Sequence, residues 1–172
     1  FDDAVQAFLK VYPRATIVNL GAGLDTTFFR VDNGALNWID LDMPDVIALR
    51  RQFIPAHPRI KCIAGSLLQS DWFARIDAPA CETLFLSGGV LYYFSEDQVK
   101  ELFVRLAACF PGSELVFDAV SQASIPYVNK GLRAAGHENA LVQWGLNNSE
   151  TLTQWHPAVQ VLQDYPLFSR IA

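Results

Sequence analysis

Two glycines separated by one residue follow a short apolar stretch near the start of the chain. Residues 19–27 read NLGAGLDTT, and the apolar, β-branched run before them predicts a buried strand over 16–20. Gly21 and Gly23 let the main chain turn tightly and let a ligand approach it closely. A dinucleotide fingerprint has a third small residue where this chain has Thr26. The spacing therefore favours a ligand without a pyrophosphate, with a plain strand-to-helix turn as the alternative.

Two acidic residues follow the glycines at the spacing of a ribose ligand, about 20 residues further on. Asp40 and Asp42 lie in the segment IDLD, at the end of a second predicted strand over 36–40. Alternate residues of an extended segment point to the same side, so either carboxylate could accept both ribose hydroxyls. The alternative is that Asp42 caps the helix that begins near Pro44 while Asp40 is solvated. We expect one acid in each role.

Polar and small residues also follow the next two predicted strands. After the strand over 59–65, Ser66 and the amide of Leu67 could hydrogen-bond an adenine ring, although Ser66 could equally be an ordinary turn hydroxyl. After the strand over 82–88, Gly88 leaves the backbone bare, and Tyr92 and Tyr93 could orient a substrate oxygen. Half-buried packing is the alternative for either tyrosine.

Strands and helices alternate along the chain, which predicts an α/β fold. The continuous apolar strands predict a doubly wound, mostly parallel, Rossmann-like sheet with helices on both faces. A fifth strand is predicted over 113–119, and helices over 1–12, 45–53 and after the capping box of Ser95 and Gln98. Less regular segments predict a helical excursion over 121–140, a sixth strand over 141–146, a helix over 149–156 capped by Ser149, and an edge strand over 158–168.

Composition narrows the classes of partner. The 172 residues carry a formal net charge of −5 and no Lys/Arg-rich run, which argues against a nucleic-acid partner or an anionic membrane surface. No apolar run is long enough to cross a membrane, so a cytoplasmic protein is expected. The cysteines, Cys62, Cys81 and Cys109, and the histidines, His57, His137 and His156, lack the spacing of metal ligands. The cysteines fit free thiols in a reducing compartment.

Four segments together resemble the class I S-adenosylmethionine-dependent methyltransferases. More narrowly, the chain resembles the leucine carboxyl methyltransferase family and its branch of polyketide-synthesis O-methyltransferases. The resemblance rests on NLGAGLDT at 19–26, IDLDMP at 39–44, SGGVLYYF at 87–94 and PGSELVFD at 111–118, with a similar tail over 144–155. It spans most of the chain, and the combination is specific although each motif alone is weak.

The resemblance implies S-adenosyl-L-methionine as cofactor and O-methyl transfer to a small-molecule carboxylate or hydroxyl, or to a protein carboxyl terminus. The glycines would pass the methionine part, Asp42 would hold the ribose, and Ser66 and Leu67 would meet the adenine. The expected cofactor-binding residues are Gly21, Ala22, Gly23, Asp25, Asp40, Asp42, Ser66, Leu67, Ser87 and Gly88. The expected catalytic residues are Tyr92 and Tyr93, and no metal is expected.

The chain also departs from the family pattern. Thr27 stands where the family often has Arg, and Ser66 where it often has Asp. We expect a single methyltransferase-like domain over 1–172 that lacks part of the family's N-terminal helical segment. Two other functions stay open: a nicotinamide-dependent oxidoreductase on a Rossmann fold, which Thr26 disfavours, and a non-catalytic methyltransferase-like binding domain. The sequence identifies neither the methyl acceptor nor the oligomeric state.

Overall fold

The computed structural model describes residues 1–164, which form two compact units. The first unit consists of Phe1–Gly88 and Cys109–Phe117. The second consists of Gly89–Ala108 and the described residues from Asp118 onward. The prediction of one methyltransferase-like domain over residues 1–172 stays a prediction.

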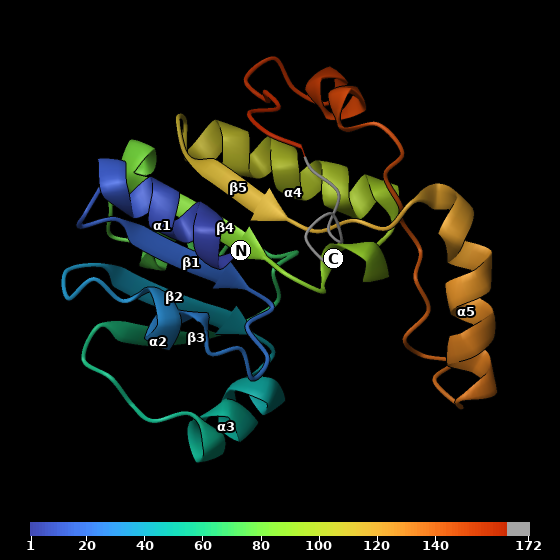
Figure 1. Ribbon diagram of the computed structural model, residues 1–172, viewed down its shortest axis with the longest axis horizontal. Helices are drawn as coiled ribbons and strands as arrows, with labels where there is room; N and C mark the ends of the chain where they lie inside the picture. Colours follow the sequence, from blue (N-terminus) through green and yellow to red (C-terminus); the bar gives the residue numbers. More distant parts are fainter. Residues whose placement is uncertain (165–172) are drawn as a thin grey trace. The chain divides into compact units, whose positions relative to one another are not determined.

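The first unit is built on a five-stranded sheet in which all pairings are parallel (Figure 1). Its strands are β1 (Thr16–Leu20), β2 (Asn37–Asp42), β3 (Ile60–Ala64), β4 (Thr83–Ser87) and β5 (Glu114–Phe117). The spatial order β3-β2-β1-β4-β5 places β4 beside β1, so the winding of the chain reverses there. In such sheets ligands bind beyond the carboxyl ends of the strands, at this reversal. The predicted α/β fold with a parallel sheet is confirmed.

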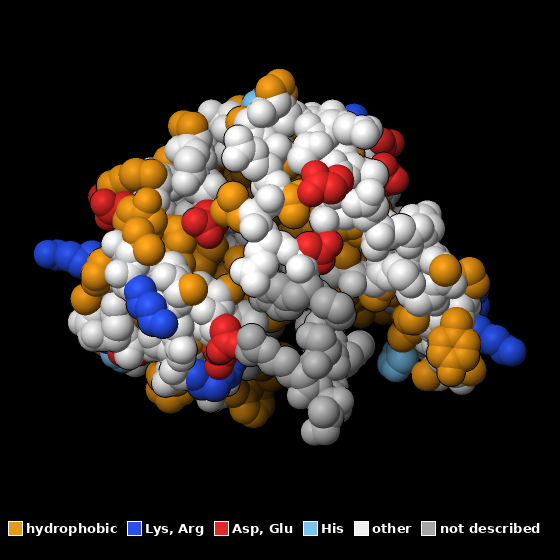
Figure 2. Space-filling view, turned by 45° about the horizontal axis from the view of Figure 1, so that its top comes forward, with side chains coloured by type: hydrophobic (Ala, Val, Ile, Leu, Met, Phe, Trp, Pro, Cys, Tyr) orange, Lys and Arg blue, Asp and Glu red, His pale blue; other side chains and the backbone are white. Residues whose placement is uncertain are grey.

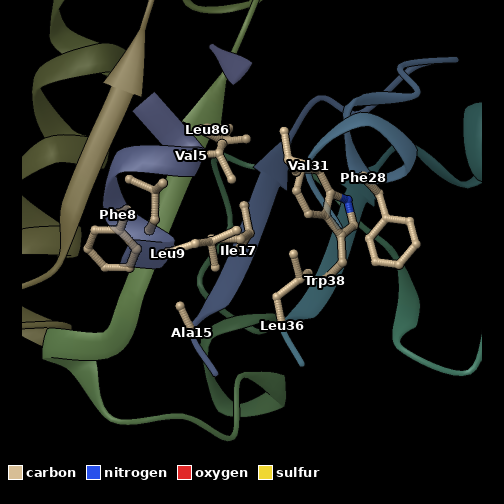
Figure 3. Close-up of a cluster of buried hydrophobic side chains, with 11 residues drawn as sticks. Val5, Phe8, Leu9, Ala15, Ile17, Phe28, Val31, Leu36, Trp38 and Leu86 are labelled. Atoms are coloured by element: carbon tan, nitrogen blue, oxygen red, sulfur yellow. The ribbon is translucent and has the colours of Figure 1, made fainter. Parts of the chain in front are cut away.

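Helices α1 (Asp2–Val11) and α2 (Thr27–Val31) pack against this sheet. The apolar residues of α1 recur at helical spacing, which gives the helix one apolar face. Figure 3 shows most of the cluster that results, which comprises Val5, Phe8, Leu9, Ala15, Ile17, Phe28, Val31, Leu36, Trp38, Leu84 and Leu86. This core fixes β1 and β2, and therefore the turns that follow them.

Helix α3 (Pro44–Phe53) begins with its proline in the first turn, where the missing amide hydrogen costs nothing. Two short 3-10 helices, η1 (Phe73–Arg75) and η2 (Ala80–Glu82), lie between β3 and β4. The predicted helix over 45–53 is confirmed, and so are the strands before and after it.

The second unit is mainly helical. It contains η3 (Leu91–Tyr93), α4 (Glu96–Cys109, apart from its last residue), η4 (Gln122–Ser124), α5 (Ile125–Ala134) and η5 (Ser149–Gln154). The predicted capping box begins α4: the Gln98 amide donates to Ser95 Oγ at 3.3 Å, and the Ser95 amide donates to Gln98 Oε1 at 2.9 Å. The helical excursion predicted over 121–140 is represented by η4 and α5.

Two predicted strands and one predicted helix cap in the second unit are wrong over the described residues. Residues 141–146 form no strand, because their amides bond to loops and to a side chain of α5. The helix at 149–154 is a 3-10 helix, and its cap is Asn148 rather than Ser149: Asn148 Oδ1 accepts the Glu150 amide at 3.0 Å. Residues 158–164 form no strand, and the remainder of that predicted edge strand, 165–168, lies outside the described residues.

Within residues 1–164, no helix is both long enough and apolar enough to cross a membrane. On the face that Figure 2 shows, the Lys and Arg side chains lie singly among polar and apolar groups.

Candidate functional site

The turn after β1 is tied to the end of β2 by main-chain hydrogen bonds. The amides of Gly21 and Ala22 both donate to the Leu41 carbonyl, at 2.8 and 3.1 Å. Gly21 and Gly23 have φ values of 71° and 47°, a region that side chains disfavour. A Cβ on Gly23 would meet no atom within 4 Å, so the requirement for glycine there is conformational. We call residues 21–25 the glycine turn.

Asp42 joins the glycine turn from the end of β2. Its Oδ2 accepts the Gly23 amide at 2.7 Å, and its Oδ1 accepts the Met43 amide at 2.7 Å. The expectation that it might cap α3 is wrong, since the N-cap residue is Met43 and no side chain caps the helix. A carboxylate accepts about four hydrogen bonds, so this half-buried group keeps acceptor capacity for a ligand.

Asp40, two residues earlier, has a different environment. Its side chain is 0% exposed, so the alternative that it is solvated is wrong. Oδ1 accepts Trp38 Nε1–H at 2.8 Å and Asn19 Nδ2–H at 3.4 Å, and Oδ2 accepts from Arg50. Burial raises the pKa of the Asp40 carboxyl, and the Arg50 charge opposes that rise. Both oxygens of this carboxylate are thus engaged within the protein, and the expectation that Asp40 binds the cofactor stays a prediction.

Arg50 is the residue of this site that the sequence reasoning missed. Although it is a charged residue of α3, it is only 2% exposed. Its Nε donates to Asp40 Oδ2 at 2.9 Å, and its Nη2 forms an ion pair with the same oxygen at 2.8 Å. Its Nη1 donates to the carbonyls of Ala22, Gly23 and Asp25, at 3.5, 3.0 and 2.7 Å. Its spacing of three residues from the buried Ile47 is the signal that could have placed it on the inner face of α3.

Asp25 ends the glycine turn and begins the next helix. Its Oδ1 accepts the Thr27 amide at 3.1 Å and the Thr27 hydroxyl at 2.8 Å. Its Oδ2 accepts Asn19 Nδ2–H at 3.1 Å, so the buried Asn19 amide links the two acids Asp25 and Asp40. The Asp25 carboxylate is thus engaged by its own turn, on the first-turn side of α2.

The loop after β3 also reaches the end of β2, where the Gly65 amide donates to the Asp42 carbonyl at 2.9 Å. Ser66 is half-buried, and its Oγ accepts the Leu68 amide at 3.3 Å. The Leu67 side chain is buried. The predicted contact of Ser66 and Leu67 with an adenine ring stays a prediction.

The end of β4 holds the last two predicted residues of the first unit. Ser87 is 0% exposed, and its hydroxyl has no hydrogen-bond partner among residues 1–164. The Phe1 ring packs over Gly88, where an added Cβ would lie 3.2 Å from the ring. A buried hydroxyl without a partner is uncommon in folded proteins.

Tyr92 and Tyr93 belong to the second unit, in η3. Their ring centroids are 4.7 Å apart. Burial raises the pKa of the Tyr92 phenol, and Asp118 and Tyr93 add to the rise. The Asp118 carboxylate accepts the Gly89 amide at 2.7 Å, at the start of the same turn. Tyr92 is therefore a neutral phenol near pH 7, able to donate a hydrogen bond but not to act as a base.

The main chain of the turn that contains Tyr92 and Tyr93 is held by the segment that follows α5. The Tyr92 carbonyl accepts the Gln143 and Trp144 amides at 2.8 and 3.2 Å, and Gln143 Nε2 donates to the Tyr93 carbonyl at 2.7 Å. The buried Asn129 side chain brackets Val142 next to it, accepting its amide and donating to its carbonyl, both at 2.8 Å. We call residues 89–93 the tyrosine turn.

No cluster of three or more metal-ligating side chains occurs within the part of the chain that the structure describes. The ring of His57 packs on Phe28, with centroids 4.8 Å apart.

Comparison with known proteins places this geometry in context. The chain is 30% identical over 171 residues to the tetracenomycin polyketide synthesis O-methyltransferase TcmP of Streptomyces glaucescens, covering 96% of this chain and 61% of that protein. It is 30% identical to the S-adenosyl-L-methionine-dependent methyltransferase dpfgK of Gibberella zeae, covering 95% and 61%. The chain thus spans 61% of the length of each of these relatives.

The fold agrees with solved structures of methyltransferases. A SAM-dependent methyltransferase from Anabaena variabilis superimposes with a TM-score of 0.68 at 14% identity, over 93% of this chain and 72% of that one. The fold is therefore the Rossmann-like fold of class I methyltransferases. The family model for leucine carboxyl methyltransferase matches residues 1–107, which is more than half of the chain, and the chain belongs to the leucine carboxyl methyltransferase family.

Proposed function

We propose that this chain is an S-adenosylmethionine-dependent O-methyltransferase. The observation that carries the proposal is the meeting of the glycine turn and Asp42 at the ends of β1 and β2, beside the strand reversal. Membership of the family and the O-methyltransferase name of the Streptomyces relative support it. A nicotinamide-dependent dehydrogenase is not favoured, because Thr26 replaces the third small residue of a dinucleotide fingerprint.

The residues at the strand ends suit this cofactor. Asp42 retains acceptor capacity for the two ribose hydroxyls, and Ser66 can reach an adenine edge. The open space at Gly23 leaves room for the methionine part, and the unpartnered Ser87 hydroxyl supplies a further polar group. When bound, S-adenosylmethionine supplies a methyl group already activated by a positively charged sulfur.

We propose that the methyl acceptor is the oxygen of a small-molecule or carboxyl-terminal carboxylate, with a hydroxyl as the alternative. A carboxylate is ionised at pH 7 and needs no base, whereas a phenol or alcohol must lose a proton. The raised pKa of Tyr92 makes it a hydrogen-bond donor, which suits holding a carboxylate in line with the methyl group. Tyr93, which is partly exposed, would line the acceptor side.

We place the reaction in the cytoplasm, without a nucleic-acid or membrane partner. Cys62, Cys81 and Cys109 are all free thiols, which suits a reducing compartment.

The test is calorimetric titration with S-adenosylhomocysteine, the product form of the cofactor. The wild-type chain should bind it, and Asp42→Ala should weaken binding about 100-fold through loss of two charge-assisted hydrogen bonds. The matched control is Asp45→Ala, which removes an exposed acid three residues further on and should leave the affinity unchanged. Absence of binding to the wild-type chain would overturn the proposal.

A turnover assay separates an enzyme from a non-catalytic relative. The chain should transfer labelled methyl groups to members of a panel of carboxylates, and more slowly to the matching alcohols and phenols. Binding of S-adenosylhomocysteine without turnover of any acceptor would favour a non-catalytic binding domain.

A further inference from the structure

The strongest unexplained feature of the molecule is a buried cation placed directly beneath the glycine turn. Arg50 is almost fully buried and is paired with the fully buried Asp40. A buried ion pair is weak evidence for stability, since apolar residues of similar volume often serve as well. A charged pair kept at this place therefore calls for an explanation other than filling the core.

The hydrogen bonds of Arg50 are divided between two tasks. Nε and Nη2 face the Asp40 carboxylate, whereas Nη1 faces only carbonyls of the glycine turn. Asp40 is itself held from two further sides, by Trp38 and Asn19. The guanidinium is planar and presents its donors in a rigid fork, so fixing one edge on Asp40 fixes the direction of the other edge.

The direction of three carbonyls determines where the adjoining amides point. In a trans peptide the carbonyl of one residue and the amide of the next are antiparallel, and the chain has no cis peptide among its described residues. With the carbonyls of Ala22, Gly23 and Asp25 turned to Arg50, the amides of the following residues point away from it. The Gly23 amide does so and meets Asp42 Oδ2 at 2.7 Å.

The other two amides of this set belong to Leu24 and Thr26. Neither has an acceptor among residues 1–164. The amides of Leu24 and Thr26 are thus donors that point away from Arg50 and remain available to a ligand. Ordering a loop in advance removes an entropic cost from binding.

We propose that Arg50 is a positioning residue that presets the glycine turn for the methionine part of the cofactor. Asp40 acts with it, by aiming the guanidinium, and is a positioning residue rather than a cofactor ligand. This inference rests on the function proposed above for the same site. It assigns to Asp40 and Arg50 a contribution that is distinct from the ribose contact of Asp42.

The test compares two ligands that differ only in the methionine part. S-Adenosylhomocysteine carries it, and methylthioadenosine carries adenine and ribose without it. In Arg50→Lys, the affinity for S-adenosylhomocysteine should fall about tenfold or more, the effect of losing one charge-assisted hydrogen bond. The affinity for methylthioadenosine should change by no more than about twofold, because Asp42 is untouched. Arg51→Lys, an exposed neighbour on α3, is the control and should leave both affinities unchanged.

Amide hydrogen exchange of the ligand-free protein tests whether Arg50 orders the glycine turn. This measurement does not depend on the proposed function. Exchange at Gly23, whose amide is hydrogen-bonded to Asp42, should accelerate about tenfold in Arg50→Lys and not in Arg51→Lys. Failure of the wild-type chain to bind either ligand would overturn the proposed function. The exchange rates would still show whether the hydrogen bonds from Arg50 order the glycine turn.

Two results would overturn the inference itself. One is unchanged exchange and affinity in Arg50→Lys. The other is an equal loss of affinity for both ligands, which would indicate a general structural role. If Arg50→Lys does not fold, the double variant Asp40→Asn/Arg50→Met leaves no unpaired buried charge and keeps an acceptor for Trp38. It should show the same selective loss for S-adenosylhomocysteine.

Discussion

The glycine turn and the tyrosine turn solve the same local problem with different chemistry. Each begins at a glycine with positive φ, and in each an aspartate accepts a glycine amide at 2.7 Å: Asp42 from Gly23, and Asp118 from Gly89. Each therefore needs a second contact to fix its remaining peptides. The glycine turn receives it from a buried guanidinium, and the tyrosine turn from main-chain amides and a neutral side-chain amide.

This difference fits what each turn would have to recognise. The planar, charged Arg50 guanidinium holds the glycine turn in one conformation, which suits a cofactor that is always the same. Main-chain hydrogen bonds from the 142–144 segment depend little on side-chain identity. The shape of the tyrosine turn therefore depends little on the side chains around it.

The largest expected effect is the loss of stability when Asp40, the acidic partner of Arg50, is removed. Asp40→Ala leaves the Arg50 guanidinium buried and unpaired, which typically costs about 3–5 kcal/mol of the free energy of unfolding. Urea denaturation followed by circular dichroism measures it. The double variant Asp40→Asn/Arg50→Met should lose much less, and an equal loss in the two proteins would show that charge pairing is not the cause.

The next largest effect is expected when Asn129 is replaced, because its uncharged side chain holds Val142, next to the residues that bond to the tyrosine turn. Asn129→Ala leaves the amide and carbonyl of Val142 without their buried partners, which should cost about 1–3 kcal/mol. Because the lost bonds are uncharged, this cost should not change with salt concentration. The exposed Asn139→Ala is the matched control and should stay close to wild type in the same urea titration. A strong salt dependence of the Asn129→Ala loss would contradict the neutral character of this region.

A smaller effect concerns the two tyrosines. Tyr92→Phe removes a neutral donor and should lower kcat about tenfold while the affinity for S-adenosylhomocysteine stays unchanged. Tyr93→Phe, in the more exposed position, should change kcat less. Steady-state kinetics with a carboxylate acceptor measures both. An undiminished kcat in Tyr92→Phe would remove this phenol from the proposed acceptor site.

Much of the first unit follows from local sequence. The strand 16–20, the glycines and the helix beginning at Pro44 are correct because each depends on nearest neighbours: apolar runs, backbone freedom and a fixed proline φ. Asp42 was predicted from its distance to the glycines, and the structure brings it to Gly23. Asp40 has the same chemistry and spacing, and only the tertiary structure shows that it is buried.

The errors arise where partners lie far along the chain. Residues 141–146 are apolar enough for a strand, but their amides bond to the Tyr92 carbonyl and to Asn129. Arg50 stands beside Arg51 in α3, and the only local sign that Arg50 points inward is its spacing of three residues from the apolar Ile47. Asn148 and Ser149 are both good caps, and the one that caps is fixed by where the turn begins.

The smallest expected effect tests whether acid sensitivity is confined to the first unit. The Arg59 guanidinium, 2.6 Å from the Asp32 carboxylate, lowers the pKa of that carboxyl below its usual range, and Arg30 does the same for the pKa of Asp2. A lowered pKa in the folded state means that the unfolded chain binds the proton more readily. The stabilisation is therefore complete above the unfolded pKa of about 4 and is lost as the pH falls through the folded pKa.

Asp32→Asn removes one of these pairs, and because it lies near the surface the melting temperature at pH 7 should fall by only about 2 °C. At pH 3 the variant and the wild type should melt closer together, since the wild-type carboxyl is then partly protonated. Amide exchange at Gln143 and Trp144 should show no matching pH dependence beyond the intrinsic rate, because both amides bond to the neutral Tyr92 carbonyl. A gap between the two melting temperatures that widens toward pH 3 would mean that the Asp32 pair does not stabilise the folded state in the way its geometry indicates.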